Sequence, residues 1–189
     1  MTNKKIILAS NSPRRKELLA GLGLPFEVHV MKDIDESYPS ELPVADVALY
    51  IAGKKANAYR ATLSSDELVI TADTVVIVGD EILGKPVDEA DAERMLRLIS
   101  GRTHQVTTGV CMLTTTSQRR FAVTTDVTFK ELSDDEIHYY ITHYKPYDKA
   151  GAYGIQEWIG YVGVTCLHGS YYNVMGLPVQ RIYEALREL

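Results

Sequence analysis

The chain has 189 residues, of which 46% are hydrophobic, and its formal net charge at pH 7 is -5. This length and composition fit one domain with an ordinary core. The negative charge argues against a nucleic acid or an anionic membrane surface as the main partner. The chain shows no signal peptide and no apolar stretch long enough to span a membrane, so we expect a cytoplasmic protein. Cys111 and Cys166 lie in apolar, strand-like runs and are expected in the core as reduced thiols.

The first stretch predicts a strand, a polar turn and a helix. Ile6–Ala9 is a short apolar run typical of a buried strand. The helix is expected to run from Pro13 to about Leu22, because proline is favoured in the first helical turn. Ser12 or Asn11 is expected to cap its exposed N–H groups.

Two arginines fall in the first turn of this helix. The positive end of the helix dipole disfavours cations there, so Arg14 and Arg15 need an explanation. A bound anion would provide one, because N–H groups, the hydroxyls of Ser10 and Ser12 and two guanidinium groups together suit a phosphate or a carboxylate. Two solvated arginines on a surface helix are an equally good interpretation of this stretch alone.

The next segments predict a strand, an acidic loop and a helix. Pro25–Met31 alternates as a strand does, and the loop after it carries Asp35 and Glu36. These carboxylates are either solvated or turned toward a metal ion or a water. Ala45–Thr62 has helical periodicity, and Lys55 falls on its apolar side. A lysine there either extends its charge to solvent, which is the more common explanation, or has a partner.

A run of β-branched residues from Leu68 to Val78 predicts a central buried strand. Asp73 interrupts this run, and a buried carboxylate is costly unless it is paired or belongs to a site. We therefore favour a functional role for Asp73. A turn at residues 79–80 returns the chain as a hairpin strand at residues 81–83. Lys85 follows this strand and could be aimed back toward Asp73.

The second half predicts further helices and strands around one irregular loop. The helices are Asp88–Ser100, Ser133–His143 and Val179–Leu189, and the long strands are His104–Leu113 and Phe121–Leu132. Residues 158–166 and 171–175 are expected to form a hairpin, and 145–156 is the loop. The pattern predicts a single α/β domain over residues 1–189, with a mixed, bent sheet flanked by helices and two lobes around a cleft.

The charged residues at unusual positions match a nucleoside triphosphate with a divalent metal. The basic ones are Arg14, Arg15, Lys55 and Lys85, and the acidic ones are Asp35, Glu36 and Asp73. The cations would neutralise phosphates, and the carboxylates would hold Mg²⁺ or Mn²⁺ or deprotonate a water. No Walker loop is present. The histidines stand at ordinary positions and are expected to be non-catalytic; they are His29, His104, His138, His143 and His168.

Six blocks in colinear order resemble the Maf family of nucleoside triphosphate pyrophosphatases. They are LASNSPRRKELL (8–19), ADT (72–74), GKP (84–86), LISGRTH (98–104), DKAGAYGIQ (148–156) and VMGLP (174–178). The resemblance implies an α/β fold with two lobes around a nucleotide cleft, often as a homodimer. It also implies hydrolysis of a nucleoside triphosphate to the monophosphate and pyrophosphate, a house-cleaning activity that would extend to modified pyrimidine nucleotides.

The family resemblance also implies a substrate branch. Thr74, Gln156 and the paired arginine Arg15 resemble the branch that acts on dTTP and UTP, whereas the 7-methyl-GTP branch typically has Ser-Asp-Gln at the aspartate. In this scheme Asp73, Glu36, Lys55 and Lys85 are catalytic, and Asp73 and Glu36 also bind the metal. Ser10, Ser12, Arg14 and Arg15 hold the phosphates. The alternative is a nucleotide-binding regulator of septum formation or cell division without essential catalysis.

Overall fold

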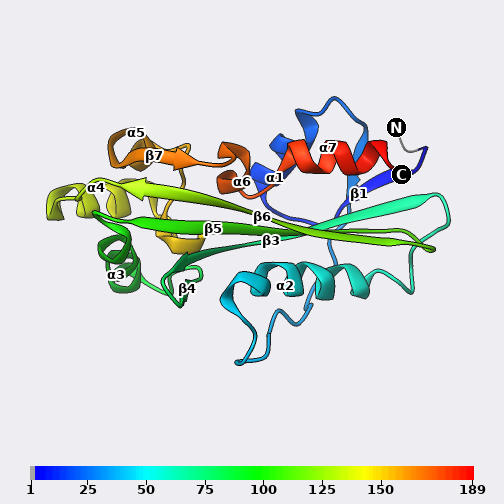
Figure 1. The fold of residues 1–189 in the computed structure, drawn as a ribbon, viewed down its shortest axis with the longest axis horizontal. Helices are drawn as coiled ribbons and strands as arrows, with labels where there is room; N and C mark the ends of the chain where they lie inside the picture. Colours follow the sequence, from blue (N-terminus) through cyan, green and yellow to red (C-terminus); the bar gives the residue numbers. More distant parts are fainter. Residues whose placement is uncertain (1–2) are drawn as a thin grey trace. The chain divides into compact units, whose positions relative to one another are not determined.

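The computed structural model of the chain describes residues 3–189 and has a mixed α/β fold (Figure 1). Within that range one sheet has the order β2-β1-β3-β5-β6-β7, and β4 pairs with β3. The strands are β1 (Lys5–Leu8), β2 (Phe26–Val28), β3 (Glu67–Val78), β4 (Glu81–Leu83), β5 (Thr103–Leu113), β6 (Gln118–Phe129) and β7 (Val164–His168). The helices are α1 (Pro13–Ala20), α2 (Val44–Ala58), α3 (Glu89–Ile99), α4 (Asp134–Tyr144), the 3₁₀ turn η1 (Ala150–Ala152), α5 (Trp158–Gly163), α6 (Tyr171–Met175) and α7 (Val179–Arg187).

The sheet is mixed, as predicted. β1 is parallel to β2 and to β3, whereas β4 is antiparallel to β3 and β7 is antiparallel to β6. The chain divides into two compact units. The first unit comprises the described residues up to Asp73 with Thr108–Val123 and Gly176–Leu189, and the second comprises Thr74–Thr107 and Thr124–Met175. Among the described residues, no helix is both long enough and apolar enough to cross a membrane.

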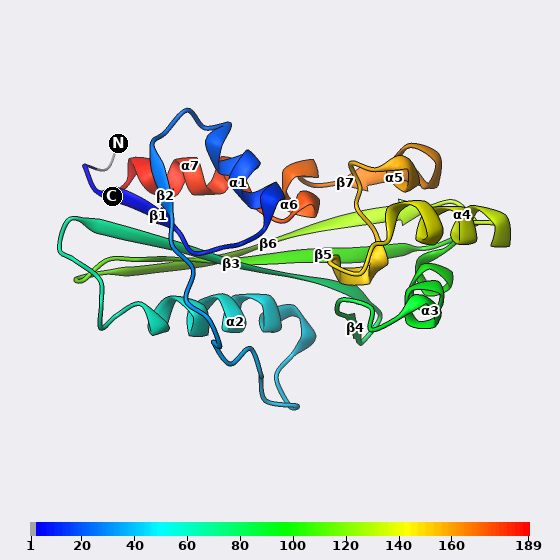
Figure 2. The ribbon, with the colours of Figure 1, turned by 180° about the vertical axis from the view of Figure 1, so that it is seen from behind.

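In the first unit, helices cover both faces of the strands. α2 lies on one face and α1 and α7 lie on the other, as Figures 1 and 2 both show. Residues Leu68–Ala72 of β3 are buried without interruption, as expected of a strand that is covered on both sides.

α2 lies unusually close to the strands of this unit. A Cβ added at Gly109 of β5 would stand 2.4 Å from backbone atoms of Ala48 and Leu49, so only glycine fits there. The hydroxyl of Thr71 in β3 donates to the carbonyl oxygen of Ala52 in α2 at 2.7 Å. The two contacts fix both the height of α2 above the sheet and its register along β3.

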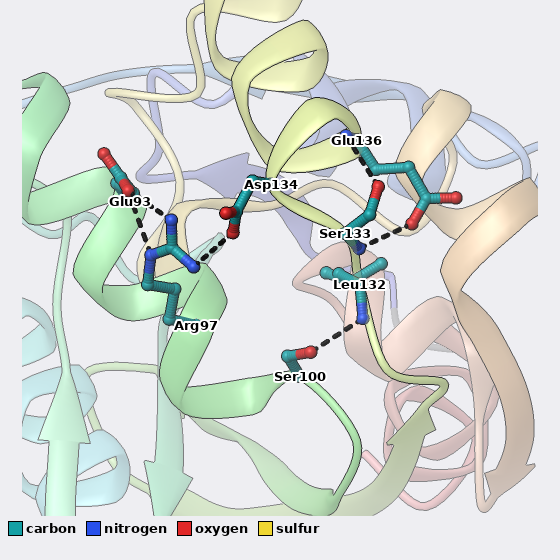
Figure 3. Close-up of polar contacts among 7 residues, drawn as sticks. All are labelled: Glu93, Arg97, Ser100, Leu132, Ser133, Asp134 and Glu136. Carbon is teal, nitrogen blue, oxygen red and sulfur yellow. Dashed lines mark hydrogen bonds and ion pairs between the residues drawn. The ribbon is translucent and has the colours of Figure 1, made fainter.

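In the second unit, the β3–β4 hairpin forms as predicted and α3 packs against α4 and η1. Ser133 and Glu136 form the predicted capping box of α4, with side chain and backbone bonded reciprocally (Figure 3). Arg97 of α3 pairs with Asp134 in the first turn of α4 at 2.6 Å (Figure 3). The acidic first turn also suits the helix dipole.

His104 is a core histidine of this unit. It is buried beside Phe129, and its Nε2 lies 2.7 Å from the hydroxyl of Tyr153. Burial lowers the pKa of His104 from 6.5 to about 4. The imidazole is therefore neutral at pH 7.

The predicted hairpin over residues 158–175 is wrong. Trp158–Gly163 is helix α5, Val164–His168 is strand β7 paired with β6, and Tyr171–Met175 is helix α6. A short apolar run does not distinguish a strand from a buried helical turn by periodicity. The buried residues of α5, Ile159 and Gly163, have the i, i+4 spacing of a helix.

The two cysteines differ in burial. Cys111 is buried, as predicted, and burial raises the pKa of its thiol. Cys166 is exposed on β7, so its assignment to the core is wrong. β7 is the last strand in the order of the sheet, and its burial pattern lacks any fully buried residue.

Candidate active site

The candidate site is centred on an ion pair between α2 and β3. Lys55 Nζ lies 2.7 Å from Oδ1 of Asp73, and the two side chains are 15% and 14% exposed. The bond from Thr71 to Ala52 explains the pairing. Asp73 follows Thr71 by two residues, on the same face of the strand, and Lys55 follows Ala52 by three, on the same face of the helix.

The same ammonium group holds a second carboxylate. Lys55 Nζ lies 3.1 Å from Oε1 of Glu36, an exposed residue in the loop between β2 and α2. We call Lys55, Asp73 and Glu36 the Lys55 cluster. Of the two explanations that the sequence left open for Lys55, an acidic partner is confirmed. The cluster joins carboxylates from segments far apart in the sequence.

The acidic loop is anchored by the lysine that precedes Lys55. Lys54 Nζ donates to Asp35 Oδ2 and to the carbonyl oxygen of Ser37, each at 2.8 Å. The Asp35 carboxylate also accepts from the Ser37 amide at 2.9 Å and from its hydroxyl at 2.8 Å. The Lys54 bond, followed by the Ser37 bonds, holds the pKa of Asp35 well below its usual range. The sequence alone did not indicate these roles of Lys54 and Ser37, because both are ordinary surface residue types.

The start of α1 is capped by its own serines. Ser12 is the N-cap, as predicted, and its hydroxyl accepts from the Arg15 amide at 3.4 Å. The hydroxyl of buried Ser10 accepts from the Ser12 amide at 3.2 Å. Arg14 lies half-buried in the first turn. Two backbone N–H groups of this turn region are thus bonded within the chain.

Arg15 is not a solvated surface arginine. Its Nε donates to the carbonyl oxygen of Gly176 at 2.8 Å and its Nη1 donates to that of Ala72 at 2.9 Å. Burial lowers the pKa of Arg15, and the negative charge of Asp73 opposes this shift. The guanidinium group therefore joins α1 to the β3 residue that precedes Asp73. Its role toward a phosphate stays a prediction.

The remaining predicted residues belong to the second unit. Lys85 is exposed in the segment that follows β4, and Gln156 is half-buried in the turn before α5. Thr74 follows Asp73 directly in β3, and these two half-buried positions interrupt an otherwise buried strand. Their approach to the Lys55 cluster stays a prediction.

The donor set of the cluster fits a hard divalent cation bound together with a phosphate. Mg²⁺ is usually held by one or two carboxylates, and its other ligands are substrate oxygens and waters. Asp73 and Glu36 supply two carboxylates within reach of one point, the Lys55 ammonium. Across residues 3–189 no group of three or more His, Cys, Asp or Glu is arranged around a metal position. The other ligands would therefore come from substrate and water.

A comparison with known protein families shows the family of this chain. The family model described as Maf-like protein matches residues 5–189. The chain belongs to the Maf family. Among Maf relatives, the dTTP/UTP pyrophosphatase of Phocaeicola vulgatus is 60% identical over 185 residues, which are 98% of this chain and 96% of that one. The dTTP/UTP pyrophosphatase of Parabacteroides distasonis is 55% identical over 183 residues, 97% of this chain and 95% of that one.

A solved structure shares the fold of this Maf chain. The HAM1 protein from Coxiella burnetii is 14% identical to it and superposes with a TM-score of 0.52 over 98% of this chain and 100% of that one. This similarity concerns the fold alone. It agrees with the predicted mixed α/β class.

Proposed function

We propose that this Maf chain hydrolyses dTTP and UTP to the nucleoside monophosphate and pyrophosphate. The names of its relatives support the substrate, because they match nearly the whole chain at 55 to 60% identity. One structural observation carries the chemistry. Lys55 holds two carboxylates from different segments, which provides a cation for phosphate oxygens and acids for a metal or a water.

In the proposed reaction, water attacks the α-phosphorus and pyrophosphate leaves. Asp73 either accepts the proton of the attacking water or holds the metal that positions it. Glu36 is the second carboxylate. Lys55, already within bonding distance of both acids, neutralises charge that develops on the phosphate. Lys85 is proposed to add a second cation near the scissile bond.

The start of α1 is proposed to hold the β- and γ-phosphates. Arg14 and Arg15 supply guanidinium groups, and Ser10 and Ser12 supply hydroxyls. The bonds from Arg15 to two backbone carbonyls support a fixed position for its guanidinium group. Such prior ordering limits the entropy that is lost when the substrate binds.

Mg²⁺ or Mn²⁺ is the proposed cofactor. Bound by Asp73 and Glu36, it would supply Lewis-acid stabilisation of the phosphate charge.

Thr74 and Gln156 are proposed to read the pyrimidine, because an amide offers a donor and an acceptor to the O4 and N3–H groups of uracil and thymine. Wrong bases would leave these polar groups unpaired, which can give strong selectivity.

Pyrophosphate release across a panel of nucleotides tests the proposal. The panel contains dTTP, UTP, CTP, GTP and 7-methyl-GTP, each with Mg²⁺ and with Mn²⁺. We expect the highest kcat/KM for dTTP and UTP. Nucleotide binding without any pyrophosphate release would favour the regulator of septum formation instead, and fastest turnover of 7-methyl-GTP would favour the other branch of the family.

A homodimer is also expected, and light scattering of the purified chain tests it.

A further inference from the structure

The loop that carries Gln156 contains a buried lysine. The side chain of Lys149 is only 9% exposed, and its Nζ lies 2.8 Å from Asp148 Oδ1 and 3.1 Å from Glu157 Oε1. A lysine so deeply buried is retained only with compensating partners. Asp148 is largely exposed, so Glu157 is the shielded partner.

Glu157 connects this lysine to α4. The hydroxyl of Tyr140, a fully buried residue of α4, donates to Glu157 Oε2. The same hydroxyl accepts from the amide of Gly154 at 2.9 Å. Burial, together with the bond to Glu157, raises the pKa of Tyr140, so the hydroxyl stays protonated and able to donate. We call Lys149, Glu157 and Tyr140 the loop network.

The loop network holds both ends of one tight turn. The amide of Glu157 donates to the carbonyl oxygen of Gly154 at 3.0 Å, which closes a four-residue turn with Gln156 at its third position. Gly154 also lies close against the ion pair of Lys149 and Glu157. A Cβ added at Gly154 would stand 3.0 Å from Lys149 Cε and 3.1 Å from Glu157 Cδ. Each end of the turn thus contacts the network.

We propose that Tyr140, Glu157 and Lys149 are positioning residues that set nucleobase selectivity by fixing the turn that presents Gln156. This inference rests on the proposed function and on the base-reading role of Gln156. An amide distinguishes uracil from cytosine only if its donor and acceptor are held in place, because the O4 acceptor of one base is replaced by the N4–H₂ donor of the other. A displacement of about 1 Å is enough to lose such discrimination.

The test measures the ratio of kcat/KM for UTP to kcat/KM for CTP. Tyr140→Phe removes the hydroxyl and keeps the ring, and Glu157→Gln removes the ion pair with Lys149. We expect each to lower the ratio by about tenfold. Tyr59→Phe is the matched control, because the buried Tyr59 hydroxyl also donates one bond, to His29, and accepts one, from Met31, in the first unit. It should leave the ratio unchanged.

A double variant separates positioning from general damage to the fold. If the network acts through Gln156, then Tyr140→Phe in a Gln156→Ala background has no further effect on the ratio. A ratio that falls again in the double variant, or equal losses on UTP and CTP in both single variants, overturns the inference. If Tyr140→Phe does not fold, the ratio of kcat/KM for UTP to that for CTP in Glu157→Gln, alone and with Gln156→Ala, decides between the two outcomes.

The two proposals fail in different ways. If the wild-type chain releases no pyrophosphate from dTTP or UTP, the proposed function fails. If the wild-type chain is active and selective but the single variants keep its ratio of UTP to CTP, only the inference about the loop network fails.

Discussion

The ammonium group of Lys55 lies 2.7 Å from the carboxylate of Asp73, and water reaches little of either side chain. The two partners are not equivalent, because Lys55 has a second acid and Asp73 has no other ion-pair partner among the salt bridges of the described residues. Loss of the aspartate charge leaves Lys55 paired with Glu36. Loss of the lysine charge leaves both carboxylates without the cation that they share.

Asp73→Asn is expected to keep the fold and to lower kcat for pyrophosphate release by roughly 10²- to 10⁴-fold, the usual contribution of a catalytic acid or base. Thermal melting monitors the fold, and pyrophosphate release gives kcat. Asp80→Asn, in the exposed β3–β4 turn, is the control and should retain activity. Near-normal turnover by Asp73→Asn would remove this residue from the mechanism.

Lys55→Met is expected to lower the free energy of unfolding by about 3 kcal/mol, because it leaves the shielded carboxylate of Asp73 without the cation that pairs with it. The adjacent Lys54→Met breaks a pair with the largely exposed Asp35 and should lower the free energy of unfolding far less. Urea denaturation of both variants measures the difference. An equal decrease in the free energy of unfolding in both variants would show that the Lys55 pair is no more shielded than a surface pair.

Asp35→Asn is expected to lower kcat by about tenfold with little change in Tm, because it weakens the bonds that anchor the loop next to Glu36. Glu36→Gln should lower kcat more than Asp35→Asn does, since it removes the proposed catalytic carboxylate itself. Asp33→Asn in the same loop is a suitable control, because asparagine tolerates the positive φ of 58° found there. Loss of activity in the control to the same degree would argue against the anchoring role of Asp35.

His104 is expected to make stability depend on pH. Its pKa is about 4 in the folded chain and near 6.5 when unfolded, so between these values the unfolded chain binds a proton that the folded chain does not. The free energy of unfolding should therefore fall by up to about 3 kcal/mol from pH 6.5 to 4. His104→Gln should lack this component, whereas exposed His138→Gln should keep it. Urea denaturation across this pH range compares the three chains.

Gly109→Ala is expected to lower the free energy of unfolding by about 3 kcal/mol, because its Cβ would overlap the backbone of α2. Activity should fall as well, since α2 carries Lys54 and Lys55. Gly84→Ala, where an added Cβ meets no atom within 4 Å, should cost far less. Similar melting temperatures for the two variants would contradict the close approach of α2 to β5.

The parts of the site that the sequence predicted are those with a local conflict. A lysine on an apolar helical face and an aspartate in a buried strand each needed a partner, and they are partners of each other. Lys54 and Tyr140 carried no such conflict, so their bonds to Asp35 and Glu157 could not be predicted. Most helices and strands had clear periodicity or caps. The region of α5, β7 and α6 did not, because its short apolar segments suit a strand or a helix equally.

The contact between Arg15 and the carbonyl of Gly176 spans 161 positions of the sequence. During synthesis, α1 is made early, and this partner follows only 161 residues after Arg15. The segment from Gly176 onward, which completes the first unit, contains none of the predicted catalytic residues. A nascent or truncated chain that ends before Gly176 can therefore contain every predicted catalytic group and still lack the carbonyl that fixes Arg15. The bond that holds Arg15 at the start of α1 can therefore form only after residue 176 has been translated.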